Sequence, residues 1–163
     1  MCFNGEPRVG PGNTSALAGE VPKRMLATMN THAAPLITGV DFVAIPAQDF
    51  DAMTAFYGET LALPFVKRWG TRDGAEYQAG NLTLAIMRME DFGGSFSPNA
   101  APIALQVDDV ALARQRLEAD GVRFVSETFD SGVCWQAICL DPDGNQLSLH
   151  RRYAPKDEAS AAT

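Results

Sequence analysis

The residues best suited to chemistry lie near the end of the chain, where a tight turn is followed by a strand. Residues 141–145 read Asp-Pro-Asp-Gly-Asn, and they predict a chain reversal because proline fixes φ and glycine tolerates positive φ. In the strand that follows, Ser148 and His150 share one face, and two leucines occupy the other. His150 is the candidate general base, since an imidazole changes charge near neutral pH. A lone histidine near the end of a domain is more often a surface or hydrogen-bonded residue, so geometry must decide its role.

The other predicted strands carry side chains that could line a pocket. These side chains are aromatic rings, a methionine, an amide and a basic group. Clefts for small ligands combine apolar and aromatic surfaces with a few polar groups. The alternative for the tryptophans is a place in the hydrophobic core. The acidic residues of the 141–145 turn lack the spacing and the terminal glutamate of a calcium loop, so we interpret them as turn residues. The predicted ligand-binding residues are Phe42, Arg68, Trp69, Tyr77, Met87, Gln106, Trp135, Ser148 and His150.

One order of elements occurs twice, and it must position these residues. Residues 43–49 and 103–109 match at a constant offset of 60 residues. In each half a strand leads into a helix with apolar residues at helical spacing, and three more strands follow. The helical stripes are Phe50, Met53 and Tyr57 in the first half, and Val110, Ala113 and Leu117, ending at Gly121, in the second. The strands are predicted over 37–46, 65–69, 75–78 and 82–87, then from 103 and over 122–125, 133–139 and 146–151.

The duplication predicts an α+β fold in which two β-α-β-β-β modules form a curved mixed sheet around a concave cleft, with the helices outside. Neither copy of such a repeat covers its own apolar face alone. Because side chains alternate along a strand, the sequence also assigns the two faces. Val43, Ile45, Ile103, Leu105, Leu147 and Leu149 should point to the helices. Phe42, Ala44, Pro102, Ala104, Gln106, Ser148 and His150 should point into the cleft.

The chain divides into a predicted flexible leader over 1–35, one folded domain over 36–151 and a flexible tail over 152–163. Within the domain, module one covers 36–89 and module two covers 102–151. The connector over 90–101 is rich in glycine, serine and proline, and it carries Phe92 and Phe96. These two rings either anchor the connector to the core or fold over the pocket as a lid.

Composition excludes several classes of protein. With a net charge of −7, an extended nucleic-acid surface is not expected, because such a surface needs clustered lysine and arginine. Three cysteines without paired spacing argue against a disulfide-stapled secreted domain. No apolar run reaches the length of a membrane span, and the N-terminal stretch lacks the apolar region of a signal peptide. We therefore expect a cytoplasmic protein with neither nucleic-acid nor membrane partners.

Four motifs in order resemble the vicinal oxygen chelate superfamily, which contains glyoxalase I, extradiol dioxygenases and bleomycin-resistance proteins. The resemblance covers roughly residues 37–151, and it implies the duplicated fold described above. It also implies a homodimer, since relatives often complete their clefts with a second subunit. The motifs are the 40–46 strand with Asp49, Phe56-Tyr57 before 61–64, the restart at 107–109 and the 141–145 turn.

The same resemblance implies where metal-binding relatives carry their ligands. The first-strand histidine falls on Phe42, the second-module ligand on Pro102 and the final-strand glutamate on Ser148. Residues 83–86, where glyoxalase I has a further carboxylate, contain none. A divalent metal needs roughly three oxygen, nitrogen or sulfur donors. We therefore expect no cofactor, unless the ligand set has been rebuilt from other residues.

We predict a binding protein that encloses a small, partly aromatic molecule in its cleft without a metal, as the bleomycin-resistance branch does. The alternative is a metal-dependent lyase or dioxygenase-like enzyme with a non-standard ligand set, such as His150 with Cys139 or Glu76. A third interpretation is a structural or regulatory dimer without a small ligand. The sequence leaves open whether the protein is an enzyme.

Overall fold

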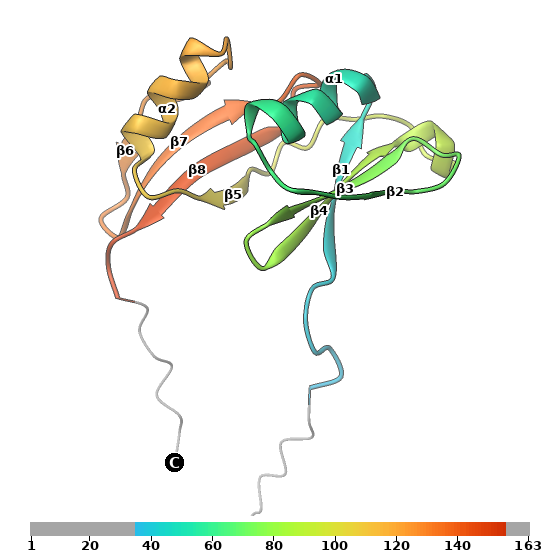
Figure 1. Ribbon diagram of the computed structural model, residues 1–163. Coiled ribbons are helices and arrows are strands. Elements are labelled where there is room, and N and C mark those ends of the chain that lie inside the picture. Colours follow the sequence, from blue (N-terminus) through green and yellow to red (C-terminus); the bar gives the residue numbers. More distant parts are fainter. Residues whose placement is uncertain (1–34, 156–163) are drawn as a thin grey trace, which may run out of the picture. The chain divides into compact units, whose positions relative to one another are not determined.

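The computed structural model describes residues 35–155 (Figure 1). The unit that carries both modules begins at Thr38. Nearly all of the predicted leader, and the tail from residue 156 onward, lie outside the described residues. No helix between residues 35 and 155 is long and apolar enough to cross a membrane.

Module one forms a four-stranded mixed sheet in the order β1-β4-β3-β2. Its first strand runs parallel to β4, and the other neighbours are antiparallel. The connector opens with a short 3₁₀ helix, η2 (Met89–Phe92). The elements of the module are β1 (Phe42–Ala47), α1 (Phe50–Ala55), the π-helix η1 (Phe56–Thr60), β2 (Phe65–Arg68), β3 (Gly74–Ala79) and β4 (Leu82–Arg88).

Module two repeats this arrangement with the order β5-β8-β7-β6. Again the first strand is parallel to the last, and the remaining pairs are antiparallel. The prediction of two β-α-β-β-β modules in an α+β fold is confirmed, with one four-stranded sheet for each module. The elements are β5 (Ile103–Gln106), α2 (Val110–Ala119), β6 (Phe129–Asp130), β7 (Cys134–Leu140) and β8 (Gln146–Arg152).

Each helix covers one face of its own sheet, as α1 and α2 do in Figure 1. The apolar residues predicted to face the helices are buried or pack against the buried cores. Their neighbours Phe42, Ala44, Ala104 and Gln106 are exposed on the other side. The alternation in the sequence therefore assigned the two faces of these strands correctly. We call the side of each sheet that its helix leaves uncovered the open face.

An aspartate side chain caps the start of each helix, and a widened turn follows the first helix. Asp49 and Asp109 accept hydrogen bonds from the amides of Ala52 and Leu112, and so cap α1 and α2. Gly121 adopts a φ of 82° after α2, the left-handed conformation expected there. The π-helix η1 was not predicted. It brings Gly58 against the Tyr77 ring, where an added Cβ would lie 3.2 Å from Cε1, so the absence of a side chain allows the close approach.

The strand predicted over 122–125 is wrong. Phe124 makes only an isolated bridge to Cys139, and the edge strand of module two is the two-residue β6 further along the chain. The reason is a side-chain acceptor: the amide of Ile138 donates to Ser126 Oγ at 2.9 Å, where a regular strand would offer a backbone carbonyl. A serine hydroxyl competes with the backbone for such bonds, and the ladder is interrupted here.

The 141–145 turn joins the two modules. The Asp143 carboxylate accepts hydrogen bonds from the amides of Gln48 and Asp49, just before α1. Asp141 Oδ2 accepts from the Tyr57 hydroxyl at 3.0 Å and from Asn145 Nδ2 at 2.7 Å. Burial raises the pKa of Asp141, while hydrogen bonds from Asn145 and Tyr57 oppose that rise. The acidic residues of this turn therefore accept hydrogen bonds from protein donors, in keeping with their interpretation as turn residues.

Candidate ligand-binding face

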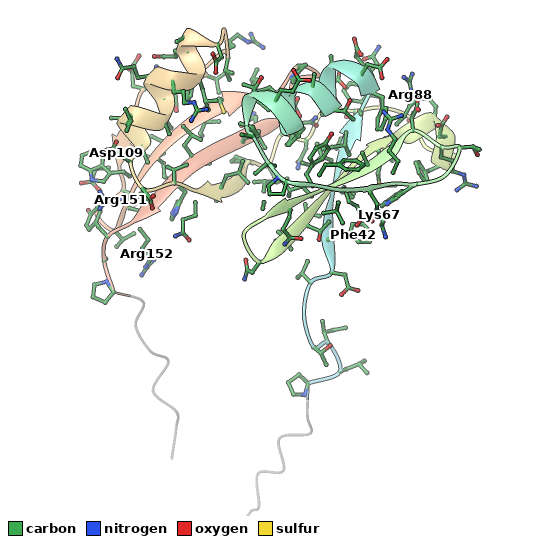
Figure 2. All side chains as sticks on the ribbon, in the orientation of Figure 1. Phe42, Lys67, Arg88, Asp109, Arg151 and Arg152 are labelled. Carbon is green, nitrogen blue, oxygen red and sulfur yellow. The ribbon has the colours of Figure 1, made fainter. Side chains whose placement is uncertain are left out.

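The open face of module one is defined by the register of its strands, because paired residues point to the same side. Phe42 pairs with Thr83, Glu76 with Ala85, and Lys67 with Glu76. Figure 2 shows Phe42 and Lys67 on the side of the sheet away from α1. The open face of module one consists of Phe42, Ala44, Pro46, Lys67, Gly74, Glu76, Gln78, Thr83, Ala85 and Met87.

Trp69 lies at the centre of an aromatic cluster on this face. Its ring meets Phe42 edge to face at 6.1 Å and Phe92 at 5.7 Å between ring centroids. Edge-to-face pairs of this kind stabilise one another beyond their buried area. Phe42 keeps 48% of its surface exposed, although it belongs to the cluster. The cluster, formed by Phe42, Trp69 and Phe92, therefore presents aromatic surface to solvent.

The half-buried carboxylate of Glu76 fixes the orientation of Trp69. The indole Nε1 donates to Glu76 Oε1 at 2.6 Å, and Lys67 Nζ lies 3.2 Å from the same oxygen. The Glu76 side chain is 14% exposed and the Lys67 side chain 60%. A hydrogen bond to a charged acceptor is stronger than one between neutral groups, so this contact holds the ring in one place.

We expect Gly74→Ala to displace Trp69. A Cβ at Gly74 would lie 2.7 Å from Trp69 Cε3, which is too close, so the indole must move away from Glu76. Overpacking of this kind lowers the free energy of unfolding by about 1–3 kcal/mol. Urea unfolding and the emission maximum of Trp69 measure the two effects. Gly39→Ala is the matched control, because no atom lies within 4 Å of an added Cβ there. Equal behaviour of the two variants would contradict the prediction.

The open face of module two carries a chain of polar contacts instead of aromatic rings. Ser148 Oγ donates to Gln136 Oε1 at 3.3 Å, and Gln136 Nε2 donates to Cys134 Sγ at 3.2 Å. His150 pairs in register with Gln106 on one side and Gln136 on the other. Ser148 therefore bonds to an amide and not to the imidazole. Among the described residues no hydrogen bond to the His150 side chain is found, so no oriented acid-base pair involves it.

The structure places six of the nine predicted ligand-binding residues on the open faces, three in each module, and three elsewhere. Arg68 pairs with Ala75, and its guanidinium lies 4.9 Å from the Phe50 ring, on the side of α1. Tyr77 is buried on that side, and its hydroxyl donates to the Thr54 carbonyl. Trp135 pairs with Arg151 on the helix side of module two. The six on the open faces are Phe42, Trp69, Met87, Gln106, Ser148 and His150. Their roles in binding stay predictions.

Two hollows lie away from the aromatic cluster. One, of about 560 Å³, is lined by Arg68 and Tyr77 beside α1. The other, of about 1000 Å³, lies between β5, α2 and the β3–β4 turn, and Gln106 and Leu112 are among its lining residues. Residues of both modules line it, with leucines beside the charged side chains of Asp108, Asp109 and Arg116. We favour the open face because an exposed ammonium lies beside three packed aromatic rings there. The smaller hollow also combines aromatic and charged side chains, but the Tyr77 hydroxyl in it already donates to the Thr54 carbonyl.

The residues at the implied metal positions do not fit a metal. Phe42 and Pro102 have no donor atom in their side chains, and Ser148 Oγ is engaged with Gln136. Between residues 35 and 155, no three histidine, cysteine or acidic side chains form a cluster that could hold a metal ion. The absence of a cofactor stays a prediction, and we derive no chemical step through a metal.

Sequence reasoning missed Lys67 and Gln136 as site residues, and it considered Glu76 only as a possible metal ligand of the alternative enzyme. Glu76 alternates with Ala75 and Tyr77 in a predicted strand, so its face could have been inferred once Tyr77 was assigned to the core. The two connector phenylalanines were predicted either to anchor the connector or to fold over the pocket as a lid. Phe92 packs against Trp69, as an anchor would. Arg72 lies over the other side of this connector, 5.2 Å from the Phe92 ring centroid.

Two βαβββ modules joined by a polar turn, each with a strand face that its helix leaves uncovered, define a class of duplicated α+β domains. The chain belongs to the Glyoxalase/Bleomycin resistance protein/Dioxygenase superfamily, whose sequence model matches residues 39–149. A comparison with curated proteins found no match.

Solved structures of this superfamily resemble the chain in fold. Lactoylglutathione lyase from Agrobacterium tumefaciens is 18% identical, with a TM-score of 0.61 over 70% of this chain and 93% of that one. TnmS3, an antibiotic binding protein from Streptomyces sp. CB03234, is 22% identical, with a TM-score of 0.62 over 73% and 99%. A superfamily member from Sphaerobacter thermophilus DSM 20745 is 21% identical, with a TM-score of 0.63 over 71% and 98%. At these identities the likeness shows the fold alone.

Proposed function

We propose that the protein binds a small, partly aromatic molecule on the open face of module one, without a metal. The observation that carries the proposal is the cluster of Phe42, Trp69 and Phe92, which lies on a strand face that no helix covers. The similar structure described as an antibiotic binding protein gives a precedent in the same superfamily. The ring of the ligand would pack against the aromatic cluster, whose own rings already meet edge to face.

The energetics favour a planar ring over an aliphatic ligand. Trp69 is held in place before a ligand arrives, because Glu76 and Gly74 fix two sides of its indole. A preorganised ring loses little conformational freedom on binding, so more of the contact energy appears as affinity. Each aromatic pair adds about 0.5–1.5 kcal/mol beyond its buried area. Removal of the Trp69 ring should therefore weaken an aromatic ligand by about twofold to tenfold through this term, and further through the lost contact area.

The two tryptophans of the chain provide a test by nuclear magnetic resonance. Naphthol and quinoline, added as probes, are expected to shift the indole N–H signal of Trp69 and to leave that of Trp135 in place. The two signals are assigned with Trp69→Phe and Trp135→Phe. Trp135→Phe should retain the ligand-induced shift, because Trp135 lies on the opposite face of its own sheet. Movement of the Trp135 signal alone, or of neither signal at saturating probe, would refute the proposal.

Elemental analysis of the purified protein tests the proposal that binding requires no metal. We expect less than stoichiometric zinc, nickel, manganese and iron. A tightly held divalent ion, lost on His150→Ala, would instead favour the metal-dependent enzyme with a rebuilt ligand set. The NMR experiment stays informative in either case, because it reports on aromatic binding and not on the metal.

A further inference from the structure

We propose that the aromatic molecule bound on this face carries a negative charge, a carboxylate, sulfonate or phenolate group, which Lys67 binds. This inference rests on the proposed function, and it names the chemical class of the ligand. It follows from the distribution of charge over the strands, which differs from that of the whole chain.

Acidic side chains are nearly absent from the strands of an acidic protein. The chain has 20 aspartate and glutamate residues against 13 lysine and arginine residues. In the eight strands of the described part, only Glu76 and Asp130 are acidic. Asp130 pairs with Trp135 and so lies on the helix side of module two. Glu76 is therefore the only carboxylate that these strands place on an open face.

Basic side chains remain on the open faces. Lys67 lies opposite Glu76 in module one, and His150 and Arg152 follow each other at alternate positions of β8 in module two. Among the strands in residues 35–155, Glu76 is the only acidic residue on an open face that could balance these basic side chains. An anion on either open face would therefore meet few repulsive charges, even though the chain as a whole is acidic. At physiological salt the charges elsewhere are screened over about 8 Å.

The ion pair between Lys67 and Glu76 exposes its positive member. The Glu76 side chain is 14% exposed and shares one oxygen between the Trp69 indole and the Lys67 ammonium. Lys67 is 60% exposed and has one ionic partner among residues 35–155, which leaves its ammonium room for a second acceptor. Within this ion pair, a ligand arriving at the strand face therefore meets the exposed ammonium before the largely covered carboxylate.

The distances place this cation beside the aromatic cluster. Because Lys67 Nζ and Trp69 Nε1 contact the same Glu76 oxygen, at 3.2 and 2.6 Å, they are no farther apart than the sum of these distances. An acidic group attached to an aromatic ring can therefore reach the ammonium while the ring lies against Trp69. Figure 2 shows Lys67 and Phe42 on the same side of the sheet, away from α1.

Two fluorescent dyes separate the charge from the ring. Anilinonaphthalenesulfonate carries a sulfonate, and phenylnaphthylamine has the same aromatic frame without it. With Lys67→Gln we expect the Kd of the anionic dye to rise roughly fivefold to tenfold, as for loss of one charge-assisted contact, and the Kd of the neutral dye to stay within about twofold. Trp69→Ala should weaken both dyes. Unchanged binding of the neutral dye to Lys67→Gln shows in the same experiment that the variant is folded.

Two control variants exclude binding elsewhere. Arg151→Gln makes the same charge change on the helix side, beside the exposed Trp135, and Leu112→Gln alters the hollow beside α2. Neither should affect either dye by more than about twofold.

The possible failures are distinct. If Lys67→Gln leaves the anionic dye unchanged while Trp69→Ala weakens both dyes, the inference about charge is overturned and the proposed function stands. Equal weakening of both dyes by Lys67→Gln would make Lys67 a positioning residue for Trp69, and it too would overturn the inference. If Trp69→Ala affects neither dye, the proposed function fails. If Arg151→Gln or Leu112→Gln abolished binding of the anionic dye, the dye would bind at another site, and the inference would be overturned.

Discussion

Replacing Asn145 by alanine is expected to lower the free energy of unfolding by about 3 kcal/mol, because it breaks the polar junction between the two modules. Asn145 is 1% exposed. Its Nδ2 donates to the Pro46 carbonyl at 2.9 Å and to Asp141 at 2.7 Å, and its Oδ1 accepts from the Asn99 amide at 2.7 Å. These partners belong to module one, the turn and the connector, so one side chain joins three segments.

The magnitude follows from the groups left behind. Alanine would leave the Pro46 carbonyl and the Asn99 amide without their partners at a part-buried position, and each unsatisfied group costs about 1–3 kcal/mol. Asp141 would also lose one of the donors that oppose the rise of its pKa. Urea unfolding followed by circular dichroism measures the change.

Asn81→Ala is the matched control for this substitution. Asn81 lies in the β3–β4 turn, the counterpart in module one of the turn that contains Asn145, and it is exposed. We expect its replacement to change the free energy of unfolding by less than about 0.5 kcal/mol. If Asn145→Ala were as mild as Asn81→Ala, the modules would be held together by their apolar contacts, and the junction would be of little energetic importance.

The regular strands were readable from the sequence because one side of each is buried. Val43, Ile45, Leu147 and Leu149 alternate with polar or small residues, and a shift of one residue would expose every apolar side chain. The helical stripe of α1 was readable for the same reason. Burial of one face leaves a periodic trace in the sequence wherever the element is regular.

The irregular parts left no such trace. Between Phe65 and Lys67 the pairing of β2 with β3 shifts, so simple alternation gives the wrong face for a residue on one side of the bulge. Trp69 follows that strand, and its position depends on a hydrogen bond to Glu76 that no pattern encodes. Pairing across strands, and not order along one strand, decides such positions.

Apolar composition was equally uninformative about Tyr77 and Trp135. Both are aromatic residues in strands, and both lie on the helix side, but one is buried and the other is 41% exposed. The difference comes from what covers them: Tyr77 lies beneath α1 and η1, whereas Trp135 lies near the outer edge of module two beside the short β6. The length of an edge strand is a property of tertiary structure, so the sequence could not separate the two residues.

Raising the pH from 8 to 11 is expected to remove about 2 kcal/mol of the free energy of unfolding through Cys139 alone. Cys139 lies in the core cluster with residues of both modules and has no exposed surface. Burial raises the pKa of its thiol from 9.0 to about 11, and the charge of Asp141 adds to the rise. The folded chain thus holds the neutral thiol more strongly than the unfolded chain does. This contribution to stability is complete below about pH 9, and it is lost as the pH rises towards 11.

The comparison is between the pH dependence of the original protein and that of Cys139→Ala, each unfolded in urea at both pH values with a phosphine reductant present. At pH 8 the free energy of unfolding of the variant should be lower than that of the original protein, because the variant lacks a buried sulfur atom. Between pH 8 and pH 11 the variant should then lose about 2 kcal/mol less of this free energy than the original protein does. Burial, with the charge of Asp141, also raises the pKa of Tyr57, which steepens the curves of both proteins above about pH 10. Tyr57→Phe removes the contribution of Tyr57 to this pH dependence and leaves the contribution of Cys139. Parallel curves for the original protein and Cys139→Ala would show that the thiolate is accommodated in the folded core, contrary to the burial that the structure describes.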